Sequence, residues 1–440
     1  MNYRKPKNSN TTYSKFLKIS FLLIVILSNL SVKAQKFDDY FTGQTLRLDY
    51  TFAGKLDSAQ VFLHDLSVQD NWHGRKNNLD KTPIQGNGQI KVYDNASNKL
   101  IYILPFSSLF QEWLTQDEAK VTSKSFENTY LIPYPKQKAR VEVSFFDSKR
   151  KEITLLKHIV DPKDILIRKA PKNDVPFEII HKSSIANPIK IAIVAEGYKE
   201  SEMDDFMKYA NLTVQSLFQH SIFKKYENSF EIVAVKSPSK DSDVSIPSEN
   251  LWRSTAVQSN FDTFYAKRYL TTSHTKLLHN LLENIPYQHI IILANTDTYG
   301  GGGILNSYAL TTTKNEKFAP VVVHEFGHSF AGLADEYFYA VDVFVNQAAD
   351  KTEPWEKNIT SLVDFKSKWS DLVDRKTPVP TPDTMLDKVK IGAFEGLKGN
   401  GLYIPSHNCR MKHNDAKDFC PVCNRAIEDL ILFYTENTSK

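Results

Sequence analysis

Hydrophobic and polar side chains alternate along the first third of the sequence, over residues 41–161. Two segments show the period of two most clearly, with apolar residues at every second position: Leu46, Leu48, Tyr50 and Phe52 in one, and Val141, Val143 and Phe145 in the other. Successive side chains of a strand point to opposite faces, so this pattern predicts strands with one buried face. A turn-forming cluster at residues 94–99 separates the apolar runs 90–93 and 100–103 and predicts a hairpin, while a helical period is visible only near residues 110–114. We therefore expect an N-terminal β-sandwich.

The pattern changes after residues 157–174, where buried apolar runs begin to alternate with longer amphipathic segments. Three strands and two helices are expected there: strands over 189–195, 230–235 and 289–294, and helices over 201–218 and 271–285. Residues 342–401 are polar, contain Pro378, Pro380 and Pro382, and have weak periodicity. They are expected to form loops and short helices inside a second domain, so the predicted fold class is α+β.

The first 34 residues have the composition of a signal peptide. Six basic residues and no acidic residue surround the apolar run 21–27: Arg4, Lys5, Lys7, Lys15, Lys18 and Lys33. Val32 and Ala34 are small residues at the positions that a signal peptidase reads, so Gln35 is the expected mature N-terminus and the protein is expected to be secreted, to the periplasm or the cell exterior. An uncleaved anchor is the alternative, but the run is shorter than the roughly 20 residues needed to cross a bilayer. No later segment is long enough, so no integral membrane segment is expected after cleavage.

Removing this leader changes the balance of charge. The whole chain has a formal charge of +4, but without the six basic leader residues 49 basic residues face 51 acidic ones, a charge of −2. No block of Lys and Arg remains that would indicate a nucleic-acid-binding face, so nucleic acid is not an expected partner. The predicted division is a signal peptide over residues 1–34, a β-sandwich over 35–165 and a catalytic domain over 166–440. The sequence makes no prediction of the oligomeric state.

The segment His324-Glu325-Phe326-Gly327-His328 has the residues and the spacing of a catalytic zinc site. On a helix, His324 and His328 lie one turn apart and can bind one Zn²⁺ ion, and Glu325 stands beside them as general base for a metal-bound water. The same motif also arises by chance on ordinary helices. Here apolar neighbours would bury the helix, a glycine would end it, and the chain is expected to be exported, which together favour the metal site.

A catalytic zinc ion takes three protein ligands, so a third must follow. Either a sharp turn returns a His or Asp, or a glutamate comes from a later helix. Gly332 is expected to end the helix and Asp335 follows it, which favours the turn with Asp335 as ligand; Glu336 is the alternative. The spacing of metzincins, a class of zinc peptidases, would need the glycine and the ligand one residue earlier, where this chain has Ala331 and Ala334. A helix-terminal salt bridge is the other role open to these two acids.

Three further residues are candidates for supporting roles. Met411, in a polar segment beside Cys409, is the candidate for a methionine turn beneath the metal, although a lone Met is more often a core residue. His413 and Tyr337 are alternative donors to the oxyanion that forms during peptide hydrolysis.

The glycine-rich segment 299–303 follows the expected strand 289–294 and precedes the motif helix. An edge strand in this region would bind an extended peptide through main-chain hydrogen bonds. A flexible hairpin without a role is the alternative.

All three cysteines of the chain, Cys409, Cys420 and Cys423, lie within fifteen residues. Cys420 and Cys423 form a C-x-x-C motif, which is open to three interpretations: a redox site, a structural zinc site with Cys409 and His413, or a local disulfide. Redox motifs follow a βαβ pattern that this segment lacks, and a local disulfide is the commoner outcome in an exported protein.

Several segments together resemble the IgA-peptidase family of secreted bacterial zinc metallopeptidases: residues 41–50, 196–198 with 202–203, 324–337 and 419–423. The resemblance spans nearly the whole mature chain, and the run H-E-F-G-H-S-F-A-G-L-A-D-E-Y and the cysteine cluster make it specific. It implies a zincin-type catalytic domain of metzincin character behind an N-terminal β-sandwich, and an endopeptidase activity. The family name does not define this protein's substrate.

The expected function is zinc-dependent hydrolysis of peptide bonds in extracellular proteins or glycoproteins, with Glu325 as general base. The alternative is a secreted glycan- or glycoprotein-binding protein whose β domain binds and whose metal site is vestigial. A structural protein of the cell surface is a third hypothesis, which predicts a metal site that is empty or closed by four protein ligands. The intact Glu325 favours the enzyme, because a binding module derived from a peptidase often loses the base.

Overall fold

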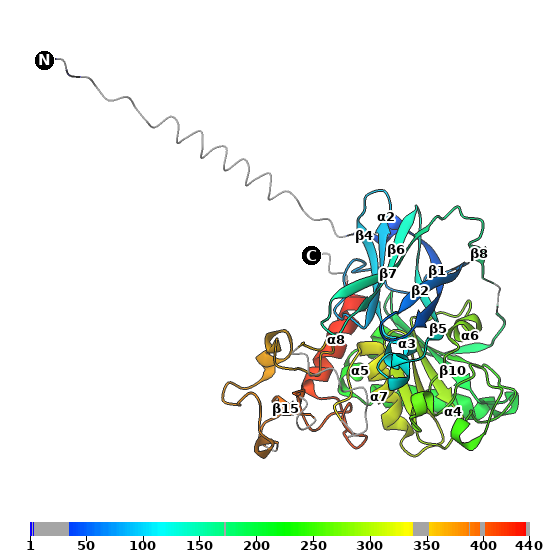
Figure 1. The fold of residues 1–440 in the computed structure, drawn as a ribbon. Coiled ribbons are helices and arrows are strands. Elements are labelled where there is room, and N and C mark those ends of the chain that lie inside the picture. The colour runs from blue at the N-terminus through cyan, green and yellow to red at the C-terminus, as the bar shows by residue number, and fades with distance from the viewer. Residues whose placement is uncertain are drawn as a thin grey trace.

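The computed structural model describes residues 1, 3, 35–170, 173–337, 352–386, 388–396 and 401–436 of the chain. Figure 1 shows a β-rich upper part, formed by the N-terminal third, resting on a larger mixed part. Apart from residues 1 and 3, the expected signal peptide lies outside the described residues. Within the described ranges, no helix is both long and apolar enough to span a bilayer.

Two four-stranded sheets form the upper part, in the orders β5-β1-β2-β8 and β4-β3-β6-β7. Neighbouring strands are antiparallel, except for a short parallel pair between β2 and β8. The strand bounds are β1 Phe41–Gly54, β2 Gln60–Gln69, β3 Gly88–Asp94, β4 Leu100–Phe106, β5 Lys124–Pro135, β6 Ala139–Phe146, β7 Glu152–Val160 and β8 Arg168–Lys169. Short helices accompany them: α2 Phe37–Tyr40, α3 Leu109–Trp113 and the 3-10 helix η1 Asp117–Lys120. The predicted hairpin is the β3–β4 pair and is confirmed.

The alternating side chains of β1 enter a core shared by both sheets. The four apolar residues that define the period in β1 are all fully buried: Leu46, Leu48, Tyr50 and Phe52. Across the sandwich the ring of Phe52 packs against Phe106 and Phe145, with ring centroids 5.8 and 5.2 Å apart. Full burial of such a side chain contributes about 1.5–3 kcal/mol, so the residues of the period-two pattern stabilise the sandwich. The predicted β-sandwich is confirmed.

A six-stranded sheet forms the centre of the lower part, in the order β13-β14-β12-β10-β11-β9. Its four inner strands are parallel and the two edge strands, β13 and β9, run antiparallel to their neighbours. The bounds are β9 Phe177–His181, β10 Ile189–Glu196, β11 Phe230–Val235, β12 His289–Ala294, β13 Gly301–Ile304 and β14 Tyr308–Thr312. The three predicted strands are therefore confirmed as β10, β11 and β12.

Helices cover both faces of this sheet, which explains why its inner strands are continuous apolar runs. One face packs against α4 Met203–Phe218, α5 Ser221–Lys225, α7 Phe318–Ala331 and α8 Pro421–Thr435. The other face packs against α6 Thr275–Leu281 and the loops before it. Short 3-10 helices lie between these elements: η2 Glu200–Glu202, η3 Glu227–Ser229, η4 Pro247–Glu249 and η5 Thr263–Tyr265.

The two predicted helices have different outcomes. The helix expected over 201–218 is confirmed, since η2 leads directly into α4. The helix expected over 271–285 is wrong at both ends, because only Thr275–Leu281 is helical. At its start, the backbone N–H of Thr272 donates to the Tyr308 hydroxyl at 3.0 Å and its side-chain hydroxyl donates to the Val257 carbonyl. These tertiary hydrogen bonds hold the segment as a loop, and Asn284, with a φ of 67°, interrupts helical backbone at the other end.

The sandwich packs directly onto one edge of the mixed sheet. The backbone N–H of Ser107 donates to the Leu305 carbonyl at 3.1 Å, and the side-chain amide of Asn306 donates to the Pro105 carbonyl at 2.8 Å. These bonds join the end of β4 to the loop between β13 and β14. The sandwich thus holds the edge of the sheet that lies next to α7.

The expected excursion over residues 342–401 is confirmed for its described part. Residues 352–386 and 388–396 contain the 3-10 helices η8 Phe365–Ser367, η9 Ser370–Leu372 and η10 Asp383–Met385, and the short strand β15 Phe394–Glu395, which pairs with β16 Tyr403–Ile404. In Figure 1 this orange segment lies to one side of the mixed part, next to the red helix α8.

Candidate metal centre and active site

Helix α7 carries the predicted motif and is almost entirely buried. Val322, Val323, Phe326 and Phe330 are fully buried in the core on one face of the sheet. The helix ends at Gly332, which has a φ of 59° and whose N–H donates to the His328 carbonyl at 3.0 Å. Only glycine adopts this left-handed conformation without strain, so the predicted glycine stop is confirmed.

Three side-chain atoms converge beside this helix. The Nε2 atoms of His324 and His328 lie 3.0 Å apart, and the Oδ1 atom of Asp335 lies 3.0 Å from the first and 3.1 Å from the second. Four-coordinate zinc with ligands at about 2.0–2.1 Å would hold such atoms about 3.3 Å apart. The triangle therefore has nearly the size that one tetrahedral zinc ion requires.

The protonation of the two imidazoles follows from their outer contacts. His324 Nδ1 lies 3.1 Å from the Arg410 carbonyl, and His328 Nδ1 lies 2.5 Å from the Leu333 carbonyl. A carbonyl oxygen can only accept, so each Nδ1 carries the proton and each Nε2 of a neutral ring presents a lone pair. With both rings neutral, three hydrogen-bond acceptors face one another at about 3 Å, an arrangement that needs a metal ion or a proton on one ring. Backbone contacts of this kind orient the histidine ligands of zinc sites.

The electrostatics of the three groups show that positive charge is favoured here, and without a metal ion a proton on His328 supplies it. Burial opposes ionisation of Asp335, but its side chain keeps 41% of its surface exposed, and the two imidazoles hold the pKa of its carboxyl well below the usual range. Burial lowers the pKa of His328, yet the Asp335 carboxylate outweighs it and raises that pKa to about 9. Asp335 Oδ1, the atom that faces the two histidines, is buried, so the exposed surface of this side chain belongs to its other atoms.

Glu325 lies between the histidines and the edge strand β13. Burial raises the pKa of its carboxyl, and the nearby Asp335 adds to this effect while the two imidazoles oppose it. A Cβ atom built on Gly301 would come within 2.7 Å of Glu325 Oε1. The carboxylate thus packs directly against the backbone of β13.

Of the two alternatives for the glycine run before the motif, the structure has the edge strand, β13. A Cβ atom on Gly303 would lie 2.4 Å from the Glu325 carbonyl oxygen and 2.7 Å from the Cβ atom of His328. Only glycine allows β13 to lie this close to the metal helix. The strand expected at 289–294 is β12, which lies inside the sheet, so the edge strand of this region is β13. Part of its outer edge is already paired, because the Gly301 N–H donates to the Arg268 carbonyl at 3.3 Å.

The segment around Met411 passes directly beneath the motif. Met411 is fully buried, and a Cβ atom on Gly327 would lie 2.8 Å from its sulfur, between the turns that carry the two histidines. The Glu336 N–H donates to the Met411 carbonyl at 2.9 Å. The structure thus brings Met411 under the metal helix, in the place where a methionine turn would lie.

The two candidate oxyanion donors lie in different surroundings. The ring of Tyr337 stacks on His324, with centroids 5.8 Å apart and an angle of 20° between the planes. The charge of Asp335, followed by burial, raises the pKa of the Tyr337 hydroxyl. His413 is exposed and belongs to neither cluster of candidate metal ligands found among the described residues.

The sandwich contributes a buried carboxylate near the motif helix, Glu112, that was not among the predicted residues. Glu112 on α3 accepts a hydrogen bond from the Tyr269 hydroxyl. Burial raises the pKa of Glu112 to about 7, although the Tyr269 hydrogen bond and the charge of His328 both lower it. The ring of Tyr269 in turn lies over Gly302 of β13. The helical period at 110–114 was the only sequence signal near this carboxylate, and it carried no information about the metal helix.

The cysteines form a separate cluster, and Glu336 belongs to it. Cys409, Cys420 and Cys423 are buried free thiols, so the expected local disulfide is not present. Their sulfur atoms and the Glu336 carboxylate lie within 4.8 Å of one another. Asp335 and Glu336 are neighbours in the chain, but the structure puts Asp335 with the histidines and Glu336 with the cysteines.

A mixed sheet whose edge strand lies along a helix bearing the H-E-x-x-H motif defines the class of metal-dependent peptidases. Comparison with protein families agrees. A family model described as IgA Peptidase M64 matches residues 178–390, and one described as Peptidase M64 N-terminus matches residues 36–157. The chain belongs to the M64 family of metallopeptidases, so the resemblance seen in the sequence is confirmed. No curated protein matches the sequence.

Proposed function

We propose that this peptidase is a secreted zinc endopeptidase that cleaves extracellular proteins or glycoproteins. His324, His328 and Asp335 would hold the zinc ion, and Glu325 would act as general base. The observation that carries the proposal is the convergence of three acceptor atoms at 3.0–3.1 Å, with both outer imidazole nitrogens bound to backbone carbonyls.

The chemistry follows from what surrounds this triangle. A bound zinc ion would supply Lewis acidity, which lowers the pKa of water and polarises a peptide carbonyl. Glu325 accepts the proton of the attacking water and delivers it to the leaving amine, since its half-buried carboxylate is adjacent to the first histidine. Tyr337, stacked on His324, is the better placed of the two candidate donors to the oxyanion. Met411 supports the helix from below.

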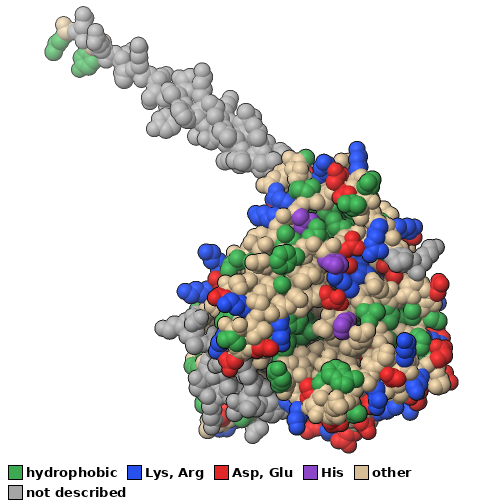
Figure 2. Space-filling view, turned by 45° about the vertical axis from the view of Figure 1, so that its right-hand side comes forward, with side chains coloured by type: hydrophobic (Ala, Val, Ile, Leu, Met, Phe, Trp, Pro, Cys, Tyr) green, Lys and Arg blue, Asp and Glu red, His purple; other side chains and the backbone are tan. Residues whose placement is uncertain are grey.

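The edge strand β13 is the proposed platform for substrate. The N–H and the carbonyl of Gly301 are already bonded to residues 268 and 270, so an extended peptide could pair with β13 only beyond Gly301, where Gly303 lies against the backbone of Glu325. Such main-chain pairing tolerates many side chains, so it supports an endopeptidase acting on unfolded or extended segments. In the face seen in Figure 2, basic and acidic side chains are largely interspersed, which favours a protein over a polyanion as substrate.

The proposed organisation follows the sequence. Residues 1–34 would be a cleaved signal peptide, 35–165 an accessory β-sandwich and 166–440 the catalytic domain, with the enzyme in the periplasm or outside the cell. The two family matches, at 36–157 and 178–390, support this division. The described catalytic elements continue to α8, which ends at Thr435, so the domain needs more than the matched segment.

The test compares the chain from Gln35 with two variants, on a denatured protein mixture as substrate. Glu325→Gln should retain its metal and lose about 10²–10⁴-fold in kcat, because only the base is removed. The double variant His324→Ala, His328→Ala should lose both the metal of this site and the activity. Full activity in Glu325→Gln would contradict the mechanism. A folded, zinc-loaded wild type that cleaves nothing and binds glycans would support the binding-protein alternative.

A further inference from the structure

The three cysteines and Glu336 enclose a second site behind the active site. Their side chains come from three separate segments: the turn after α7, the segment before α8, and the start of α8 itself. Cys409, Cys423 and Glu336 are fully buried and Cys420 is 2% exposed. We propose that these four residues bind a structural zinc ion, distinct from the catalytic one.

The spacing of the donor atoms suits zinc and does not suit a disulfide. The sulfur atoms of Cys409 and Cys423 lie 3.6 Å apart, and the Cys423 sulfur lies 3.1 Å from Glu336 Oε1. Tetrahedral zinc with Zn–S distances of about 2.3 Å holds two sulfur ligands roughly 3.7 Å apart. A disulfide would need these sulfur atoms at about 2.05 Å. Three thiolates and one carboxylate are a donor set that favours zinc over harder ions such as Mg²⁺ or Ca²⁺.

Glu336 supplies an independent sign that a cation belongs here. Its Oε1 atom accepts a hydrogen bond from the Asn358 side chain at 3.0 Å, but Oε2 is buried with no hydrogen-bond partner among the described residues. An unsatisfied buried polar atom is unfavourable, and more so if it is charged. Buried thiols alone would pack as small apolar groups and would not explain why a carboxylate points at them. A metal ion satisfies the carboxylate and the three sulfurs together.

The backbone around the sulfur atoms is arranged as around metal-bound thiolates. The Cys420 N–H donates to the Cys409 sulfur at 3.3 Å, and the Cys423 N–H donates to the Cys420 sulfur at 3.5 Å. Cys420 also occupies the N-cap of α8, where the helix dipole stabilises negative charge. These contacts orient the sulfurs and offset part of their charge.

The proposed ion would have a structural role, because the site is closed. Four protein ligands fill a tetrahedral zinc ion, whereas catalytic zinc keeps one position free. The contrast in exposure agrees, since Glu336 is fully buried while the Asp335 side chain is 41% exposed.

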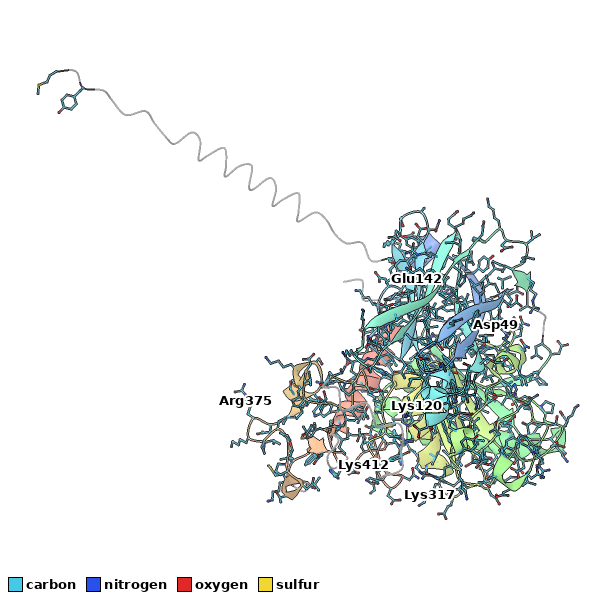
Figure 3. The ribbon with its side chains drawn as sticks, in the orientation of Figure 1. Asp49, Lys120, Glu142, Lys317, Arg375 and Lys412 are labelled. Atoms are coloured by element: carbon cyan, nitrogen blue, oxygen red, sulfur yellow. The ribbon has the colours of Figure 1, made fainter. Side chains whose placement is uncertain are left out.

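This second site would also position the first. Glu336 directly follows Asp335, and Cys409 directly precedes Arg410, whose carbonyl lies 3.1 Å from His324 Nδ1. Lys412 closes the same region, since its amine donates to the Glu336 carbonyl at 3.2 Å. Figure 3 shows Lys412 in the lower half of the molecule, well away from the sandwich residues Asp49 and Glu142. A zinc ion held by Glu336 and Cys409 would therefore fix both the third ligand and the orientation of the first histidine.

Metal counting on the chain from Gln35 tests the proposal without relying on activity. We expect two zinc ions per chain by mass spectrometry in the wild type, and one in the double variant His324→Ala, His328→Ala. The remaining ion should be replaceable by cobalt(II), which then gives intense thiolate-to-cobalt charge-transfer absorption in the near ultraviolet. One zinc ion in the wild type, none in the double variant and a disulfide in the unreduced protein would overturn the proposal.

A matched pair of carboxylate variants separates ligation from burial. Glu336→Gln should lose zinc to a chelator at least about tenfold faster than the wild type, because a neutral amide is a weaker ligand. Glu283→Gln removes another buried carboxylate, one that accepts a hydrogen bond from Gln69 at 2.7 Å, and should leave zinc retention unchanged. Equal retention in both variants would contradict ligation by Glu336.

Thiol accessibility gives a second reading that needs no variant. In the folded wild type all three cysteines should resist alkylation, and they should become reactive only after a chelator removes zinc. Rapid alkylation of zinc-loaded protein would refute the site. These measurements are independent of the proposed peptidase mechanism. An inactive protein with two zinc ions and protected thiols would contradict that mechanism but would still support this second site.

Discussion

Replacing Gly303 by alanine tests whether the edge strand β13 sets the geometry of the active site. The added Cβ atom would lie 2.4 Å from the Glu325 carbonyl oxygen, where ordinary contact begins at 3.4 Å, so β13 and α7 must separate by about 1 Å. Overpacking of this kind costs about 1–3 kcal/mol. The reduced freedom of the unfolded chain returns about 0.4–1 kcal/mol, so a net loss of stability is expected. A displacement of about 1 Å at catalytic groups lowers the rate by roughly 10²-fold.

Gly43→Ala is the matched control, because Gly43 also lies in a strand but has no atom within 4 Å of an added Cβ. Urea unfolding and kcat/KM on a common peptide substrate should be measured for both variants. We expect Gly303→Ala to lose stability and activity, and Gly43→Ala to match or slightly exceed the wild type in stability with unchanged activity. Wild-type stability and kcat/KM in Gly303→Ala would refute the contact between β13 and α7.

Three further predictions follow from particular residues. Asp335→Ala should lose the zinc ion of the histidine pair and essentially all activity, whereas Glu336→Ala should still bind that ion, although less tightly because the second site positions Asp335; loss of the ion in Glu336→Ala with retention in Asp335→Ala would contradict the assignment of the third ligand. Dialysis against a zinc chelator should abolish cleavage, and added zinc should restore it; activity that survives complete metal removal would contradict the mechanism. Burial lowers the pKa of His289 to about 3 in the native state. Below about pH 6.5 this histidine is therefore protonated in the unfolded chain but stays neutral in the native state. The free energy of unfolding should consequently fall as pH decreases. Between about pH 6 and pH 4 this one residue should cost about 2–3 kcal/mol, so His289→Phe should weaken the pH dependence by that amount in urea unfolding; an unchanged slope would contradict it.

The sequence predicted those elements whose signal is local. The period of two in β1 predicts a strand because every second residue enters the core. The helix α4 was predicted from its amphipathic pattern, and the strands β10, β11 and β12 from their continuous apolar runs. The end of α7 was predicted from Gly332, because glycine readily adopts the left-handed backbone conformation that ends a helix.

The other features of the fold and the site depend on tertiary contacts, which no local sequence pattern can predict. The glycines of β13 left an edge strand and a flexible hairpin as alternatives, because the sequence does not show that α7 packs against them and leaves no room for side chains. The start of the expected helix at 271 became a loop through hydrogen bonds to Tyr308 and Val257, which are distant in the sequence.

The same reasoning explains the ambiguity over the third ligand. The sequence does not distinguish Asp335 from Glu336, since either carboxylate could bind zinc. The chain separates them because Glu336 turns toward Cys423, at 3.1 Å, while Asp335 turns toward the histidines. The sequence showed the three cysteines close together. It did not indicate that Glu336 completes their cluster, because Glu336 lies next to the active-site motif and was considered as a ligand there.

Anomalous X-ray diffraction at the zinc edge, from crystals of the chain beginning at Gln35, tests the central claim most directly. The account predicts an anomalous peak at about 2.0–2.2 Å from His324 Nε2, His328 Nε2 and Asp335 Oδ1, with a water molecule in the fourth position next to Glu325. A zinc-replete crystal without a peak at this triangle, or with the ion bound by a fourth protein ligand there, would contradict the peptidase mechanism.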